Sequence, residues 1–235
     1  PKLGTREIRH ALGMLIDRDR LLRALRIPNA ATAYAPVPAE VKTAPEPHPA
    51  PYQKIGTDDR RAIAQVLLQE ESITPGTPAT LRLLVLPGRV NAGIARTLIE
   101  SWSKAGVTLD VQVRAAGDYL GALMAGDYDL ALATSRETGA TAWSYIAPFA
   151  KVAGPDNLSH YAEEDFEMHI ETAAISLDAN GVSVAIGNAE GVLAEDQPII
   201  PLFTFRPGQP VAAGVNGWDP TVTGIHPLRL LAPRS

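Results

Sequence analysis

Residues 5–25 read TREIRHALGMLIDRDRLLRAL and carry the most specific pattern in the chain. Apolar residues recur at Ile8, Leu12, Leu15, Leu22 and Leu25, which is the spacing of one face of a helix. The pattern predicts an amphipathic helix with an Ile-Asp-Arg-Asp sequence near its middle. Periodicity alone favours an ordinary core helix, so an indication of function has to come from the particular residues of this segment and from the rest of the chain.

Composition limits the class of protein. The chain has 235 residues, 46% hydrophobic and 20% charged, which is typical of one large globular domain with a real core. A net charge of -5 argues against nonspecific nucleic-acid binding, and the absence of cysteine excludes disulfides, thiolate metal sites and cysteine nucleophiles. No apolar run approaches the roughly 18 residues of a membrane helix. The chain starts without Met or a signal peptide, which fits either a mature secreted protein or a piece of a longer one.

The middle of the chain alternates between strand and helix patterns. Leu81, Leu83 and Val85 alternate as a strand, and a helix with Trp102 on its apolar stripe comes next and ends near Gly106. The remaining elements are predicted as a helix at 57–69 capped by Thr57, a strand at 107–113, a short helix at 118–125 and a strand at 128–132. This order implies parallel pairing with right-handed crossovers. We predict an α/β lobe whose mixed, largely parallel sheet is flanked by helices.

The segments on either side of this alternation are less regular. Residues 30–51 hold six prolines, each without a backbone donor, and are predicted to form an extended surface loop. Helices are expected at 163–174 and 182–194, although three glycines weaken the second by up to about 1 kcal/mol each. A last strand is expected at 199–205.

Several motifs together resemble one family. "IRHALGMLIDRDRLL" looks like the "VRqAL..AIDRdaL" segment of the family 5 extracellular solute-binding proteins, the peptide-binding receptors of ABC importers. Five further segments resemble the family in the same order, namely "AIAQVLLQEESITPG" at 62–76, "LIESWSKAGVTLDVQV", "YLGALMAGDYDLAL", "NLSHYAEEDFE" and "EGVLAEDQPIIPLF". The resemblance implies a periplasmic-binding-protein-like lobe over residues 1–205, including the loop 30–51. Residues 206–235 would return toward an amino-terminal lobe that the chain does not contain, so half of the ligand site is missing.

The resemblance also implies the function. It predicts the substrate-binding component of an ABC transporter, which captures a peptide or a similar small solute and works with a membrane permease. Such a receptor is not an enzyme, takes no cofactor, metal or nucleic acid, and is periplasmic or extracellular as a full-length protein. One alternative is the ligand-sensing domain of a transcription regulator with the same fold, which the sequence upstream of Pro1 would decide. A small hydrolase is another alternative, but GxSxG, GxxxxGK and HExxH are absent.

The loop after the third predicted strand is the first site candidate. Ligands of open α/β sheets bind outside the carboxyl ends of the strands, where residues 134–143, TSRETGATAW, fall. In many peptide-binding relatives this loop carries "gW..D...p", and its Asp pairs with the α-ammonium group of the peptide. The resemblance puts Ser135 at the Trp position and Glu137 or Thr138 at the Asp position. Glu137 can do the same electrostatic work, or it pairs with Arg136 or points to solvent.

Other candidates carry alternatives of their own. Trp143 and Tyr145 either line the pocket or pack beneath the loop, and Tyr34 in the proline-rich loop is a candidate for the cleft. Arg206 either meets a ligand carboxylate or is a surface charge. Two acidic groups have structural interpretations that we favour. Asp127 and Asp129 are a possible acid-base pair but fit a turn and a strand start, and the acidic run 163–167 fits a helix N-terminus better than a metal site.

Overall fold

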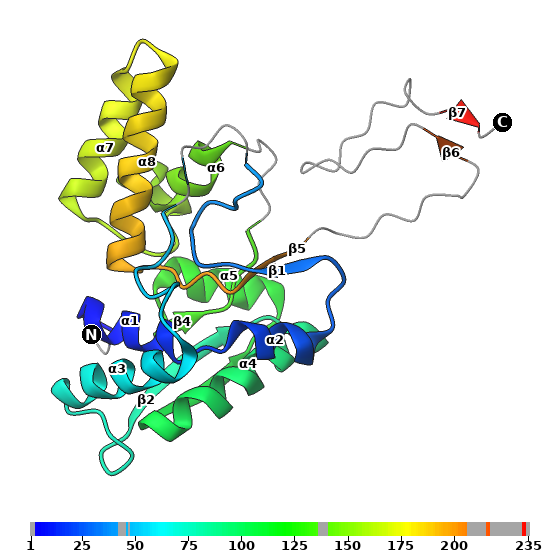
Figure 1. The fold of residues 1–235 in the computed structure, drawn as a ribbon, viewed down its shortest axis with the longest axis vertical. Helices are drawn as coiled ribbons and strands as arrows, with labels where there is room; N and C mark the ends of the chain where they lie inside the picture. The colour runs from blue at the N-terminus through cyan, green and yellow to red at the C-terminus, as the bar shows by residue number, and fades with distance from the viewer. Residues whose placement is uncertain are drawn as a thin grey trace.

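The computed structural model describes residues 3–41, 46, 48–135 and 141–205, together with the backbone of 215–216 and 232–233. A parallel sheet lies at its centre, as the alternating pattern predicted. The strands β2 (Ala79–Val85), β3 (Val107–Val113) and β4 (Leu130–Ala131) are ordered β3-β2-β4, and β2 pairs in parallel with both neighbours. The crossovers are α4 (Arg89–Trp102) with the 3-10 turn η1 (Ser103–Ala105), and α5 (Ala116–Ala125) (Figure 1).

The first helical segment is broken in two, which corrects the expectation of a single helix. The structure has α1 (Arg6–Met14) and α2 (Arg18–Leu25), and the break falls at the Ile-Asp-Arg-Asp sequence. Asp17 leaves helical conformation and its carboxylate accepts a hydrogen bond from the backbone N–H of Arg20, at 2.9 Å. An aspartate at this position caps a new helix, because it satisfies one of the four free N–H groups of the first turn.

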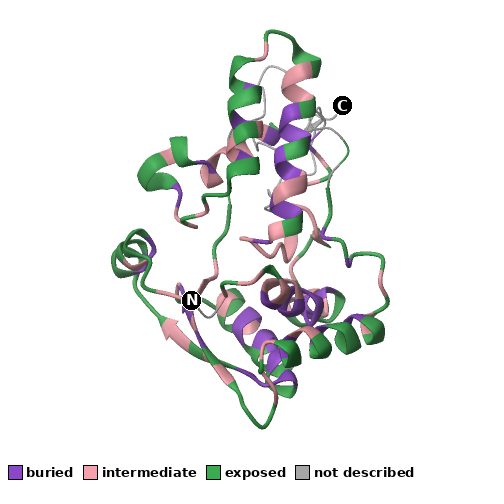
Figure 2. Ribbon diagram, turned by 90° about the vertical axis from the view of Figure 1, so that its left-hand side faces the viewer, coloured by how far each residue is buried: buried purple, intermediate pink, exposed green. Residues whose placement is uncertain are grey.

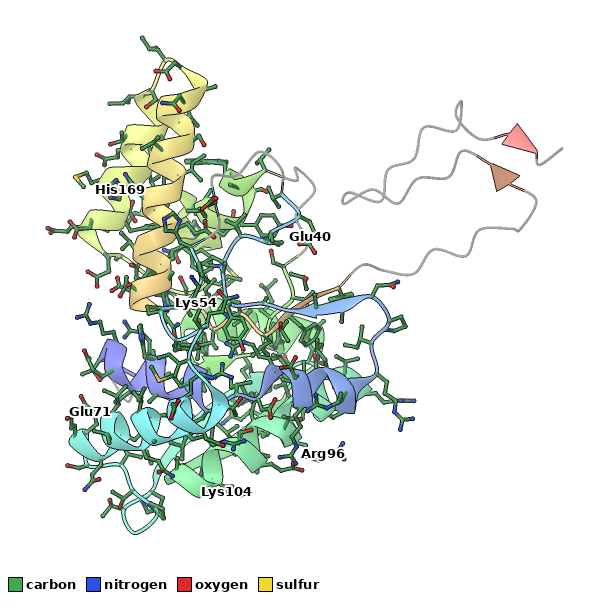
Figure 3. The ribbon with its side chains drawn as sticks, viewed as in Figure 1. Glu40, Lys54, Glu71, Arg96, Lys104 and His169 are labelled. Carbon is green, nitrogen blue, oxygen red and sulfur yellow. The ribbon has the colours of Figure 1, made fainter. Side chains whose placement is uncertain are left out.

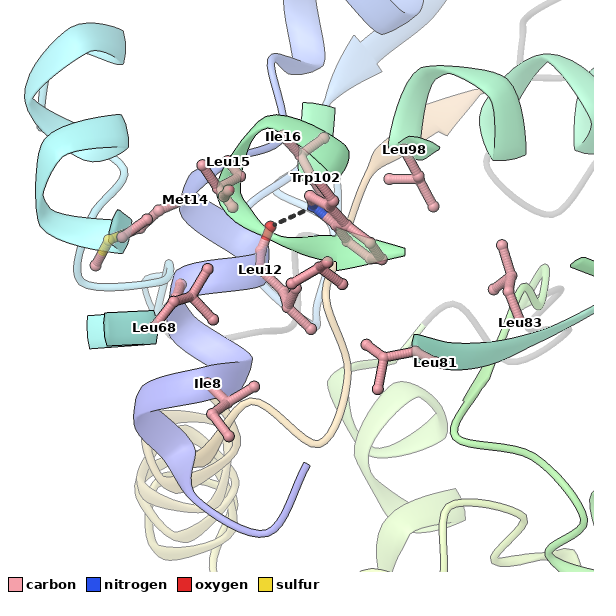
Figure 4. Packing of buried hydrophobic residues seen from close by; sticks show 14 of the residues in the cluster. Ile8, Leu12, Met14, Leu15, Ile16, Leu68, Leu81, Leu83, Leu98 and Trp102 are labelled. Carbon is pink, nitrogen blue, oxygen red and sulfur yellow. Dashed lines mark hydrogen bonds between the residues drawn. The ribbon is translucent and has the colours of Figure 1, made fainter. Parts of the chain in front are cut away.

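The main core lies between the sheet and the helices α1, α3 and α4. Trp102 is 2% exposed and its indole N–H donates to the carbonyl of Leu12 at 3.0 Å, so the prediction of a core tryptophan is confirmed (Figure 4). The inward strand residues Leu81 and Leu83 face the same cluster. Each fully buried aliphatic side chain contributes on the order of 1.5–3 kcal/mol. Helix α5 covers the opposite face of the sheet through Tyr119 and Leu123.

A helical hairpin stands above the sheet. After α6 (Ala142–Ile146) and the 3-10 turns η2 (Ala147–Phe149) and η3 (Lys151–Asp156), the chain forms α7 (Glu164–Ile175) and α8 (Ala179–Asp196). The acidic run lies at the N-terminus of α7, as expected. Helix α8 begins three residues earlier than predicted because Asp178 caps it by accepting from the N–H of Gly181. Figure 2 shows buried residues in both helices of this hairpin and in the helices beside the sheet.

The described part of the proline-rich loop holds bends and turns and no helix, and it is not wholly at the surface. It leaves the strand β1 (Ala30–Thr32) and ends at α3 (Thr57–Glu70). Val37 is fully buried against the hairpin, whereas Ala50 and Tyr52 are buried in the main core. The loop therefore joins the two clusters. Thr57 is the first residue of α3 rather than its cap, which is Gly56.

The last predicted strand is shorter and pairs elsewhere. The strand β5 (Phe203–Phe205) runs antiparallel to β1 in a separate two-stranded sheet, so the antiparallel part of the predicted mixed sheet stands apart from the parallel strands. Two short strands, β6 (Val215–Asn216) and β7 (Ala232–Pro233), also pair antiparallel. The division at residue 206 stays a prediction. No helix among the described residues is long and apolar enough to cross a membrane.

Candidate functional site

The carboxyl ends of the three parallel strands meet at one edge of the sheet. Val85 lies opposite Val113, and Leu84 lies opposite Ala131. The backbone continues the ladder for one more residue, since the N–H of Arg114 donates to Val85 at 3.0 Å. We call this the carboxyl edge. It is the place where ligands bind in open parallel sheets.

The loop after β4 is held at both ends. At its start the hydroxyl of Tyr119 donates to the carbonyl of Leu132 at 2.9 Å, and burial raises the pKa of this phenol above its ordinary value. At its end the side chain of Thr141 caps α6 by accepting from the N–H of Ser144 at 3.4 Å. The hydroxyl of Ser144 donates to the backbone carbonyl of Thr141 at 2.7 Å. Between these anchors the chain carries three of the predicted ligand residues, Arg136, Glu137 and Thr138, which lie outside the described residues. The predicted ligand residue Arg206, after β5, also lies outside the described residues.

The two aromatic residues after the loop lie on α6. Trp143 and Tyr145 are half-buried and pack against the cluster formed with α7 and α8. Part of each side chain therefore contributes to packing, which is one of the two predicted alternatives, and part stays accessible to solvent. Their role toward a ligand stays a prediction.

Tyr34 belongs to a different cluster. Its ring lies 4.2 Å from the guanidinium carbon of Arg18, and its hydroxyl accepts from Arg60 at 3.0 Å. The ring of Tyr52 meets it edge to face with centroids 6.3 Å apart. The three described site candidates thus divide between the main core and the hairpin cluster.

Sequence reasoning missed Arg18, which organises this region. Its guanidinium is 1% exposed and donates to the carbonyls of Ala33 at 2.8 Å, Pro201 at 2.9 Å and Gly13 at 3.1 Å. One side chain therefore ties the ends of α1, β1 and the segment before β5. A signal existed, because Arg18 falls three residues after Leu15 on the apolar stripe, where a surface arginine is out of place.

The acidic pair at the start of β4 has a structural role, as predicted. Asp127 forms an ion pair with Arg82 at 2.5 Å, and Asp129 accepts from the backbone N–H of Arg82 at 2.7 Å. Both carboxylates therefore hold β2 to the incoming strand. Among the described residues, no three histidine, aspartate or glutamate side chains are arranged to hold a metal ion.

The comparisons with known proteins agree with this architecture. The model of "Bacterial extracellular solute-binding proteins, family 5 Middle" matches residues 1–157, and the chain therefore belongs to this family. Its fold is that of the periplasmic binding proteins. The unliganded open form of the murein tripeptide-binding protein MppA superposes with a TM-score of 0.83 at 20% identity, covering 92% of this chain and 42% of that one.

Curated relatives are distant but match over most of the chain. The periplasmic oligopeptide-binding protein OppA of Haemophilus influenzae is 22% identical over 219 residues, covering 91% of this chain. An uncharacterized lipoprotein of Mycobacterium tuberculosis is 29% identical over 209 residues, covering 86%. The chain spans 40% and 35% of the length of these two relatives. A structure of the Haemophilus OppA in complex with the peptide RPPGFSPFR superposes with a TM-score of 0.78 at 20% identity, covering 98% of this chain and 46% of that one.

Proposed function

We propose that this chain is the carboxy-terminal lobe of a receptor that captures peptides for an ABC importer. The observation that carries the proposal is the family match over residues 1–157, joined to a parallel sheet with an open carboxyl edge. The named relatives bind oligopeptides or a murein tripeptide, which makes a peptide the first ligand to test. These relatives give no support to the transcription-regulator alternative.

The receptor works without covalent chemistry. Two lobes close on the solute by hinge motion, and the closed form is recognised by a membrane permease. The missing partner lobe supplies the other half of the cleft. The full-length protein would act in the periplasm or outside the cell; the relative OppA is named a periplasmic protein and another relative a lipoprotein.

The loop between Leu132 and Thr141 is the proposed ligand contact on this lobe. Its anchors support this assignment, because Tyr119 and Ser144 fix its two ends beside the carboxyl edge. Glu137 would meet the peptide α-ammonium group in a charge-assisted hydrogen bond. Arg136, Thr138, Trp143, Tyr145 and Tyr34 would line the cleft, and Arg206 would meet a carboxylate.

The test uses the full-length receptor and a pool of short peptides, with binding followed by titration calorimetry. We expect selective peptide binding, and failure of every peptide to bind would overturn the proposal. Glu137→Gln should weaken binding at least about tenfold, because a charge pair away from water is lost. Glu70→Gln, an exposed acid on α3, is the matched control. Equal binding of amino-terminally acetylated and free peptides would reject the contact of Glu137 with the α-ammonium group, and would leave the proposed peptide-receptor function in place.

A further inference from the structure

Charge divides this chain at residue 151. The 54 residues from Val152 to Phe205, which contain the hairpin, include no lysine or arginine. They hold ten acidic residues, Asp156, Glu163, Glu164, Asp165, Glu167, Glu171, Asp178, Glu190, Glu195 and Asp196. Residues 1–151 hold eighteen lysines and arginines against fifteen acids. The hairpin region is therefore acidic, whereas residues 1–151 carry a small excess of positive charge (in Figure 3, His169 on α7 and Arg96 on α4 lie at opposite ends of the molecule).

Three acids on the outer side of the hairpin face solvent. Glu164 and Glu171 on α7 and Asp178 in the turn are exposed. Within the described part of the chain, no lysine or arginine side chain lies within ion-pair distance of them. Their negative charge therefore attracts a partner that carries the opposite charge.

The same helix exposes large apolar side chains. Met168 is 52% exposed and Ile175 is 78% exposed, and Leu177 in the turn is fully exposed. Glu164, Met168, Glu171 and Ile175 are spaced four, three and four residues apart, so they share one face of α7. The inward residues of α7, such as Phe166, pack against α8 and leave this outer face without a neighbour among the described residues.

We propose that this outer face of α7, with the turn at Leu177, docks onto the membrane permease of the importer. The inference rests on the proposed function. The surface fits a partner that carries lysine or arginine beside apolar side chains, because opposite charges steer the encounter and the apolar groups are then removed from water. Anionic lipid headgroups would repel the same surface, which argues against the membrane itself as the occupant.

The test uses the full-length receptor and the importer in lipid nanodiscs, with the receptor concentration that half-maximally stimulates ATP hydrolysis as the readout. Glu164→Lys with Glu171→Lys should raise this concentration at least about tenfold at low salt and leave peptide affinity unchanged. Glu70→Lys with Glu71→Lys makes the same charge change at the end of α3, away from the hairpin. This control should have little effect on the half-maximal concentration. Melting curves verify that all variants are folded.

Four results would overturn the inference. One is equal stimulation by the α7 variant and the unmodified receptor, and another is an equal loss in both double variants. The third is binding of the unmodified receptor to empty anionic nanodiscs, which would make lipid the occupant. The fourth is self-association that the α7 variant abolishes, which would make a second copy the occupant. Failure of the unmodified receptor to bind any peptide would instead reject the proposed function. Failure of the docking inference is therefore distinguishable from failure of the proposed function.

Discussion

Arg18 shows how one buried side chain can fix several segments at once. Its guanidinium donates to three carbonyls from separate parts of the chain and lies over the ring of Tyr34. No carboxylate among the described residues lies within ion-pair distance of it, so hydrogen bonds and the aromatic face compensate its lost hydration. Arginine suits this position because its planar fork presents five donors in fixed directions.

Replacing Arg18 should therefore be costly. Arg18→Met is expected to lower the free energy of unfolding by about 2–4 kcal/mol, because buried carbonyls lose their donor. Arg18→Lys should recover only part of this, since one ammonium group cannot reach the same carbonyls. Urea unfolding measures the effect. Arg23→Met, at an exposed position of the same helix, is the control and should change stability by no more than about 0.5 kcal/mol. Equal effects at the two positions would contradict the assigned role.

Glu190 is a second buried charge, and it makes stability depend on pH. Its side chain on α8 is fully buried, accepts from the N–H of Val37 at 3.1 Å and lies 3.7 Å from the ring of His48. Burial raises the pKa of this carboxyl above its ordinary value of 4.5, although the hydrogen bond from Val37 and the nearby ring of His48 oppose the shift. The folded state thus holds the proton more tightly than the unfolded chain, and stability falls as pH rises through the raised pKa.

Glu190→Gln should remove this fall. The stability of the variant relative to the unmodified protein is expected to increase as pH rises from the ordinary carboxyl value of 4.5 through the raised pKa of Glu190. Denaturant unfolding at a series of pH values within this range measures the difference. Parallel pH profiles for the two proteins would show that the carboxyl has the same pKa folded and unfolded.

At the scale of elements, two glycines have opposite effects on stability. Gly106 joins η1 to β3 with φ of 88°, and a Cβ there would lie 2.3 Å from the carbonyl of Thr74. Gly117 lies in the first turn of α5, and a Cβ there would meet nothing within 4 Å. The first glycine is required by the turn into the sheet, whereas the second only weakens a helix.

The same substitution should therefore change stability in opposite directions at these two positions. Gly106→Ala is expected to destabilise by about 2 kcal/mol or more, from the left-handed backbone and the clash together. Gly117→Ala should stabilise by about 0.5–1 kcal/mol, because alanine is the better helix former and restricts the unfolded chain. Thermal and urea unfolding of the two variants test the pair. Stabilisation by Gly106→Ala would show that the turn is free to rearrange.

At the scale of the whole molecule, this chain should bind peptides only weakly by itself. The proposed cleft has two walls, and the second belongs to the missing lobe, so closure cannot exclude water from the ligand. We expect affinity no tighter than the millimolar range, on the order of 4 kcal/mol. Calorimetry on residues 1–235 measures this against the full-length receptor. Micromolar binding to the isolated chain would contradict the expectation and place the whole site on this lobe.

Much of the architecture was predictable because each pattern depends on near neighbours in the sequence. Alternation at Leu81, Leu83 and Val85 identified a strand with one buried face, and the stripe ending at Trp102 identified its crossover helix. A buried face imposes its period on the sequence whatever covers it. The residues around Asp17 and Arg18 identified the family correctly, although the helix breaks there.

Contacts between distant segments were decided only by the tertiary structure. Nothing in the sequence indicates that Arg18 reaches the carbonyl of Pro201, that Val37 is buried against α8, or that β5 pairs with β1. Such contacts depend on which backbone groups and apolar faces come together when loops close, and no local period encodes that. The composition of residues 152–205 was readable from the sequence alone. The packing of α7 against α8 decided which side of α7 is buried. Only the tertiary structure therefore showed that acidic and apolar residues of α7 share its uncovered face.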